Sequence, residues 1–100
     1  MPTHYETEAF RRAYSRLTPE QRRQFKSALQ KFINDLREME TGETQRFRSG
    51  LRVRSLQADP RKYEMTWAGD GRAVFAWGTP QRPGFRHIEW LDIGGHEILP

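Results

Sequence analysis

The stretch GLRVRSLQADPRKYEMTWAGDGRAVFAW, beginning at Gly50, constrains the fold of this chain most strongly. Apolar and polar residues alternate at 51–54, 63–67 and 72–77, which is the pattern of half-buried strands. A Gly-Asp-Gly segment at 69–71 supplies residues that tolerate positive φ, as a tight hairpin requires. The stretch therefore predicts three short strands joined by turns.

The alternation also predicts that this sheet has one apolar face and one polar face. The side chains predicted to face the core are Tyr63, Met65, Trp67, Phe75 and Trp77. The side chains predicted to share the opposite face are Arg52, Arg54, Glu64, Thr66 and Arg72.

Two helices are predicted before this sheet. Thr7 can cap the first helix, whose apolar residues recur at helical spacing. Thr18 can cap the second, with Gln21 completing a capping box, and Gly42 is a suitable stop. The short connection between them predicts an antiparallel helix hairpin that covers one face of the sheet.

The remaining segments complete a single α+β domain over residues 1–100. Thr3 and Tyr5 can form a short N-terminal strand, 78–84 reads as a loop, and 87–93 reads as a last strand. The predicted order is thus a short N-terminal strand, a two-helix hairpin and an antiparallel sheet of three to four strands. The predicted core comprises Leu29, Phe32, Ile33, Leu36, Val53, Met65, Trp67 and Phe75.

The charge composition is compatible with binding to phosphates. The chain has 17 basic and 13 acidic residues, and fourteen of the basic residues are Arg. A GC-rich genome would favour Arg codons, but the planar guanidinium is also the preferred bidentate ligand of phosphate. Only the arginines of the central strands alternate with core residues, so only those are arranged like a site.

Other classes of protein receive little support. The absence of cysteine excludes disulfides and thiol chemistry, and no apolar run approaches the length of a membrane span. The N-terminus does not resemble a signal peptide. His4, His87 and His96 show no metal-ligand spacing, and no glycine-rich nucleotide motif is present. We therefore expect a cytoplasmic protein without a metal or cofactor.

The charged groups that remain could cleave RNA. In that reaction a base takes the 2′-hydroxyl proton, an acid protonates the 5′-oxygen, and cations stabilise the phosphorane. Arg72 at the start of a strand, His96 after the last strand and Glu64 on the polar face are the candidates. Each also has a plainer interpretation as a solvated or ion-paired surface residue.

The segments LRVRSL, YEMTWAGDGRAVFAW and HIEWLDIGGHEIL, after a helix hairpin, resemble the RelE/ParE superfamily of bacterial type II toxins. The resemblance spans about residues 3 to 99, and its motifs are degenerate. Arg72 matches an arginine that family members place at the scissile phosphate, and His96 matches a terminal histidine that serves as acid or base in some members. The chain departs from the family at Glu64 and Thr66, where some members carry paired lysines. It also departs at Leu99, which replaces a terminal aromatic residue.

The resemblance implies a toxin that inhibits translation as a ribosome-dependent, metal-independent mRNA endoribonuclease (an mRNA interferase). Arg72, His96 and Glu64 would be catalytic, and Arg52, Arg54 and Thr66 would bind RNA. Its partners would be a cognate antitoxin, in a hetero-oligomer, and mRNA on the ribosome, with no membrane. Two alternatives stay open: a ParE-like toxin that poisons a topoisomerase, and a degenerate member that only binds RNA or an antitoxin.

Overall fold

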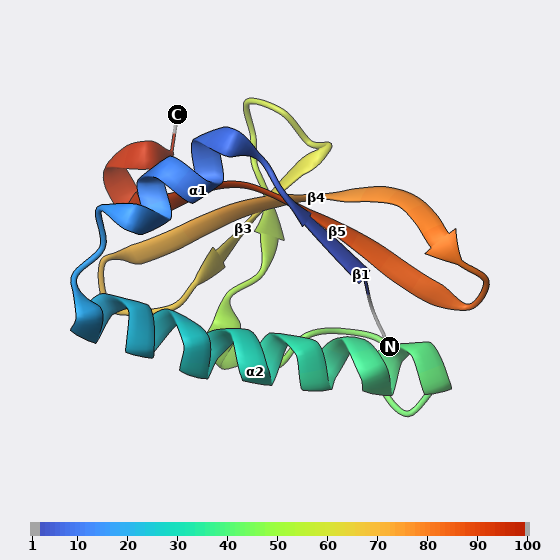
Figure 1. Cartoon of the computed structure of the whole chain (residues 1–100). Helices are drawn as coiled ribbons and strands as arrows, with labels where there is room; N and C mark the ends of the chain where they lie inside the picture. Colours follow the sequence, from blue (N-terminus) through green and yellow to red (C-terminus); the bar gives the residue numbers. More distant parts are fainter. Residues whose placement is uncertain (1–2, 100) are drawn as a thin grey trace.

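The computed structural model describes residues 3–99, which form a five-stranded sheet with two α-helices (Figure 1). The elements in order are β1 (Thr3–Glu6), α1 (Glu8–Ser15), α2 (Pro19–Thr41), the 3₁₀ turn η1 (Ser49–Leu51), β2 (Arg54–Ser55), β3 (Lys62–Thr66), β4 (Gly71–Arg82), β5 (Phe85–Gly95) and the 3₁₀ turn η2 (His96–Ile98). This order confirms the predicted α+β class. None of the helices in the described residues carries an apolar stretch suited to crossing a bilayer.

The sheet is mixed, with the strand order β1-β5-β4-β3-β2. The pairs β2/β3, β3/β4 and β4/β5 are antiparallel, as predicted. The N-terminal strand β1 pairs in parallel with β5, so that Thr3 lies opposite His87. The first and last strands of the chain are therefore neighbours in the sheet.

Local capping interactions begin and end the helices where the sequence predicts. The hydroxyl of Thr7 accepts a hydrogen bond from the Phe10 amide at 3.1 Å and so caps α1. Thr18 and Gln21 form the reciprocal capping box of α2. Gly42 ends α2 with a φ of 84°, a left-handed conformation that glycine adopts without steric cost.

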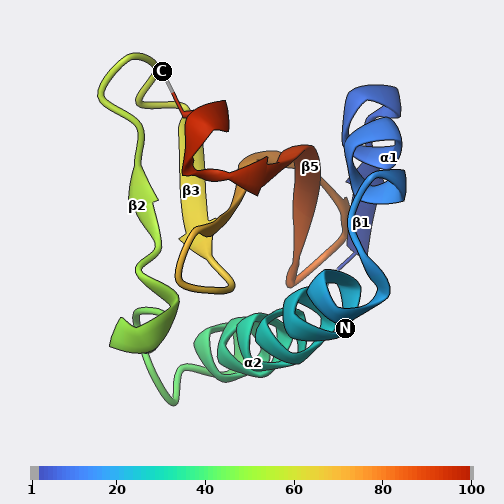
Figure 2. The ribbon, with the colours of Figure 1, turned by 90° about the vertical axis from the view of Figure 1, so that its left-hand side faces the viewer.

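The core lies between α2 and one face of the sheet (Figure 2). Phe32 of α2 is fully buried, with its ring 4.6 Å from that of Phe47, 5.1 Å from Phe75 and 5.3 Å from Trp90 (centroid distances). Of the predicted core residues, those that are buried are Phe32, Leu36, Met65, Trp67 and Phe75. The others are half-buried: Leu29, Ile33 and Val53.

Two predicted segments differ from the structure. Residues 51–54 are not a continuous strand: η1 is followed by Arg52 in the left-handed region, at φ 48°, and only Arg54–Ser55 pairs with β3. The segment 78–84 is not a loop, because β4 continues through Pro80 to Arg82 before the chain turns at Gly84, which has φ 81°. Proline is tolerated at Pro80 because it lies beyond the paired Gly78, where the ladder register is interrupted.

The face of the sheet opposite α2 is less open than predicted. Glu64 and Val74 on this face are only 4% and 6% exposed, and Leu56 beyond β2 is also buried. In Figure 2, η2 and the segment after β2 lie on this side of the sheet. Contacts with segments distant in sequence therefore turn part of a predicted polar surface into interior.

An ion pair between the buried Asp35 and the exposed Arg48 anchors the segment that connects α2 to η1. Asp35 is 5% exposed and accepts hydrogen bonds from the Arg48 amide at 2.9 Å and from its Nε and Nη2 atoms at 3.0 and 2.8 Å. The Arg48 side-chain hydrogen bonds, aided by its backbone N–H, lower the pKa of Asp35 despite the opposing effect of burial. The carboxylate is thus held in its ionised form.

Asp35→Asn should therefore weaken the acid sensitivity of the fold. The pKa of Asp35 in the folded protein lies below its value of about 3.9 in the unfolded chain, so ionised Asp35 stabilises the fold. This stabilisation is complete above about pH 4 and is lost as the pH falls through the folded-state pKa. Urea unfolding at about pH 6 and about pH 3 should show a smaller loss of stability for the variant than for the wild type. Equal losses in both proteins would contradict this assignment.

Candidate functional site

Strand register places four of the five predicted polar residues on the sheet face opposite α2. Arg54 pairs with Glu64 across β2 and β3, and Thr66 pairs with Arg72 across β3 and β4. Paired residues point to the same side of a sheet, here the side away from the buried Met65. Arg52 is the exception, because it lies outside the strands.

Glu64 is engaged by Arg54. The Nε atom of Arg54 donates to Glu64 Oε1 at 2.5 Å, and the Glu64 side chain is 5% exposed against 74% for Arg54. The two residues line a small cavity together with Leu56 and Leu99. Leu99 is therefore beside this ion pair.

The guanidinium of Arg72 is held over the turn that precedes its own strand. Its Nη1 atom lies 2.9 Å from the carbonyl oxygen of Gly71, 3.3 Å from that of Gly69 and 3.4 Å from that of Ala68. Within residues 3–99, its Nε and Nη2 atoms have no hydrogen-bond partner. These atoms remain available for an anion.

The turn itself works differently from the prediction. Neither Gly69 nor Gly71 has a positive φ. Two backbone hydrogen bonds close the turn: the Gly71 amide donates to the Ala68 carbonyl oxygen at 3.1 Å, and the Trp67 amide donates to the Gly71 carbonyl oxygen at 3.1 Å. Gly71 is needed for space, because a Cβ there would lie 2.5 Å from two carbons of the Trp67 ring. The buried indole therefore packs directly on the backbone beside Arg72.

Gly71→Ala should consequently destabilise the fold by about 1–3 kcal/mol, the usual cost of overpacking a filled site. Gly69→Ala is the matched control in the same turn, since a Cβ at Gly69 meets nothing within 4 Å. Urea unfolding of both variants checks the prediction. Equal stabilities would contradict the close approach of Trp67 to the Gly71 backbone.

A basic groove lies between α2 and this turn. The volume of this basic groove is about 580 Å³. Its charged lining residues are Lys31, Arg48, Arg52 and Arg72, with no acidic residue among the described lining. Asp35 neutralises Arg48, whereas Lys31, Arg52 and Arg72 make no ion pair within residues 3–99. The groove therefore presents three uncompensated positive charges.

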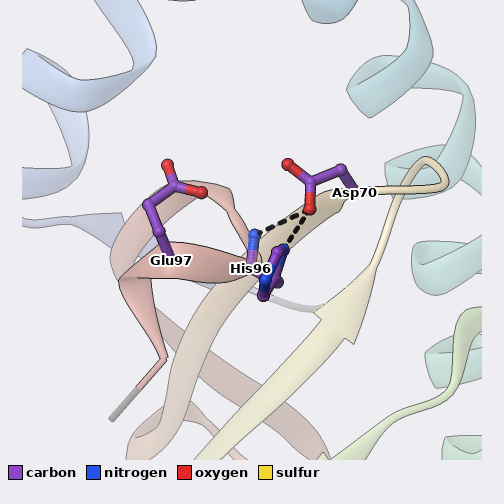
Figure 3. Close-up of side chains that lie close together, drawn as sticks. All are labelled: Asp70, His96 and Glu97. Carbon is purple, nitrogen blue, oxygen red and sulfur yellow. Dashed lines mark hydrogen bonds and ion pairs between the residues drawn. The ribbon is translucent and has the colours of Figure 1, made fainter.

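His96 lies at the neighbouring end of the sheet and contacts Asp70 (Figure 3). The register of β4 and β5 pairs Gly71 with Gly95, so Asp70, which precedes Gly71, is adjacent to His96, which follows Gly95. Asp70 Oδ1 contacts the imidazole Nδ1 and also accepts from the His96 amide at 3.4 Å. Both side chains are well exposed, at 68% for Asp70 and 72% for His96.

The charge on Asp70 is favoured by its neighbours. The side-chain and backbone hydrogen bonds from His96 lower the pKa of Asp70, and the positive charge of Arg72 adds a smaller contribution. Asp70 thus lies within electrostatic reach of both Arg72 and His96. Sequence reasoning passed over Asp70 as a turn residue, and its position between two glycines was the only signal.

Asp70, His96 and Glu97 could in principle offer ligands to a metal ion, since their donor atoms lie within 4.8 Å of one another. All three side chains are exposed, and Glu97 Oε1 accepts from the Gly95 amide at 3.2 Å. Hydrogen bonds within the group account for its geometry. We assign no metal to it.

The structure therefore divides the predicted site into three places. Arg52, Thr66 and Arg72 line the basic groove. His96 contacts Asp70 at the adjacent strand ends, whereas Glu64 and Arg54 form an ion pair farther along β3.

Comparison of the chain with models of protein families, with curated proteins and with solved structures finds no match, so membership of the RelE/ParE superfamily stays a prediction.

Proposed function

We propose that the chain is the toxin of a type II toxin–antitoxin system and cleaves mRNA on the ribosome. The observation that carries this proposal is that Arg72 lines the basic groove and also acts electrostatically on Asp70, whose carboxylate contacts His96 at the ends of β4 and β5. A phosphodiester needs cationic groups at its oxygens and a proton acceptor beside them. The resemblance in sequence to RelE-like toxins agrees with this chemistry.

Under the proposal, the RNA backbone enters the basic groove and the scissile phosphate lies against Arg72. The permanently charged guanidinium stabilises the phosphorane without having to change its protonation state. His96 takes the proton of the 2′-hydroxyl, the 2′-oxygen bonds to phosphorus, and the bond to the 5′-oxygen breaks. The leaving oxygen takes a proton from water, and the products are a 2′,3′-cyclic phosphate and a 5′-hydroxyl.

The proposal gives Glu64 no part in proton transfer, because the side chain is buried and bound to Arg54. Arg52 and Lys31 would bind RNA phosphates along the groove. A cognate antitoxin would hold the toxin inactive, and an acidic partner would match the charge of the groove. These roles all depend on the same surface.

The test is expression of the chain alone and with the product of a neighbouring short acidic reading frame, if its locus has one. Growth should stop in the first case and resume in the second. Purified protein should cut a synthetic mRNA only when ribosomes are present, leaving the ends named above. Growth arrest with intact mRNA and inhibited topoisomerase would favour the ParE-like alternative, and the absence of arrest would favour a degenerate binder.

A further inference from the structure

We infer that Asp70 is a positioning residue for His96: it holds the imidazole so that the neutral ring carries its proton on Nδ1 and presents an unprotonated Nε2 as the base. The link to catalysis rests on the proposed function, whereas the tautomer is a property of the chain itself. Nothing in the sequence pattern pointed to this pair.

The contact is built into the backbone. Asp70 ends the turn before β4, and His96 begins η2 after β5. Gly71 and Gly95 are the last paired residues at this end of β4 and β5, so Asp70 and His96, which flank that pair, lie next to each other. The same Asp70 oxygen that contacts the ring also accepts from the His96 amide at 3.4 Å. The carboxylate is thus bound at two points of one residue, which restricts both the backbone and the ring.

Gly95 makes room for this arrangement. A Cβ at Gly95 would overlap the free carboxylate oxygens of both Asp70 and Glu97. The backbone there, at φ −83°, is open to any residue, so the requirement is for space alone. A side chain at this position would push Asp70 away from His96.

Hydrogen-bond chemistry determines which ring nitrogen of His96 carries the proton. An ionised carboxylate can only accept, so its contact with Nδ1 requires a proton on that nitrogen. Asp70 is exposed and its pKa lies below the ordinary value for aspartate, so it is ionised at neutral pH. In water the neutral histidine ring favours the proton on Nε2, so Asp70 reverses the usual preference. Nε2 then has the lone pair that removal of a 2′-hydroxyl proton needs.

The other charged groups around the ring do not replace Asp70. The Glu97 carboxylate also lies close to His96, but its Oε1 atom accepts a hydrogen bond from the Gly95 amide at 3.2 Å. Arg72 contributes positive charge at Asp70. Arg16 and Asp92 line a cavity that Asp70 and Glu97 also line, and neither makes a hydrogen bond to His96 within residues 3–99. Glu97 is therefore the matched control for a carboxylate next to His96.

Long-range ¹⁵N–¹H NMR of the uniformly labelled full chain, recorded at a pH where the rings are neutral, tests the inference. The wild type should show His96 protonated on Nδ1, and Asp70→Ala should shift the ring to mainly Nε2–H. Glu97→Gln should leave the wild-type tautomer unchanged. His87, whose Nδ1 lies 2.7 Å from the Thr3 hydroxyl, provides an internal reference in each spectrum.

A wild-type His96 protonated on Nε2, or a tautomer that Asp70→Ala does not change, would overturn the inference. A second measurement links the tautomer to the reaction: Asp70→Ala should lower kcat for ribosome-dependent cleavage with little change in KM, and Glu97→Gln should not. If the wild type does not cleave mRNA, the proposed function fails, but the NMR result still decides the role of Asp70.

Discussion

Replacing His96 by alanine should slow ribosome-dependent mRNA cleavage by about 10²–10⁴-fold, the usual contribution of a positioned acid or base. Arg72→Ala should cost about 10²–10³-fold, because it removes the cation nearest to the developing charge. The two losses should combine to less than their product if both residues act on one transition state. Single-turnover cleavage of a synthetic mRNA on purified ribosomes measures these rates.

Both variants should stay folded, since His96 is exposed and Arg72 bonds only to nearby turn carbonyls. Arg12→Ala is the matched control for loss of positive charge, because Arg12 is exposed on α1 and does not line the basic groove. It should cleave at the wild-type rate. Cleavage that survives both His96→Ala and Arg72→Ala would refute the proposed catalytic site.

Phe32→Ala should lower the free energy of unfolding by about 3–5 kcal/mol. The side chain is fully buried among Phe47, Phe75 and Trp90, so its removal loses transfer free energy and leaves a cavity that these rings cannot readily fill. For a domain with a typical stability of about 5–15 kcal/mol, this loss could unfold a large fraction of the molecules at 37 °C.

Chemical unfolding followed by tryptophan fluorescence provides the measurement. Tyr5→Ala is the matched control, because Tyr5 is an aromatic residue that is 52% exposed, and its truncation should change stability only slightly. A Phe32→Ala protein about as stable as the wild type would contradict the central packing of Phe32.

The helices and the apolar face of the sheet were predictable because their signals are local. A cap such as Thr18 with Gln21 acts within one turn, and the alternation of Met65 and Trp67 follows from strand geometry alone. The bulge in β5 was not predictable: Phe75 pairs with Trp90 but Val74 pairs with Asp92, so both Trp90 and Ile93 reach the core at uneven spacing.

The candidate site was only partly predictable for the same reason. The alternation that placed Arg72 and Thr66 on one face is local, and the register bears it out. Glu64 is buried and lies beside Leu99, which is 35 residues farther along the chain, so no local pattern could indicate its environment. The partner of Asp70 is 26 residues away, and only the pairing of β4 with β5 brings it near.

The parallel pairing of β1 with β5 also has a consequence for how the protein is made. Thr3 pairs with His87, which lies 84 residues later in the sequence, so β1 is synthesised long before its partner strand exists. Contacts this distant in sequence are also slow to form, because a large loop must close first. Until translation has passed β5, β1 lacks its sheet partner and the sheet is incomplete, so this domain can acquire its final shape only after β5 has been made.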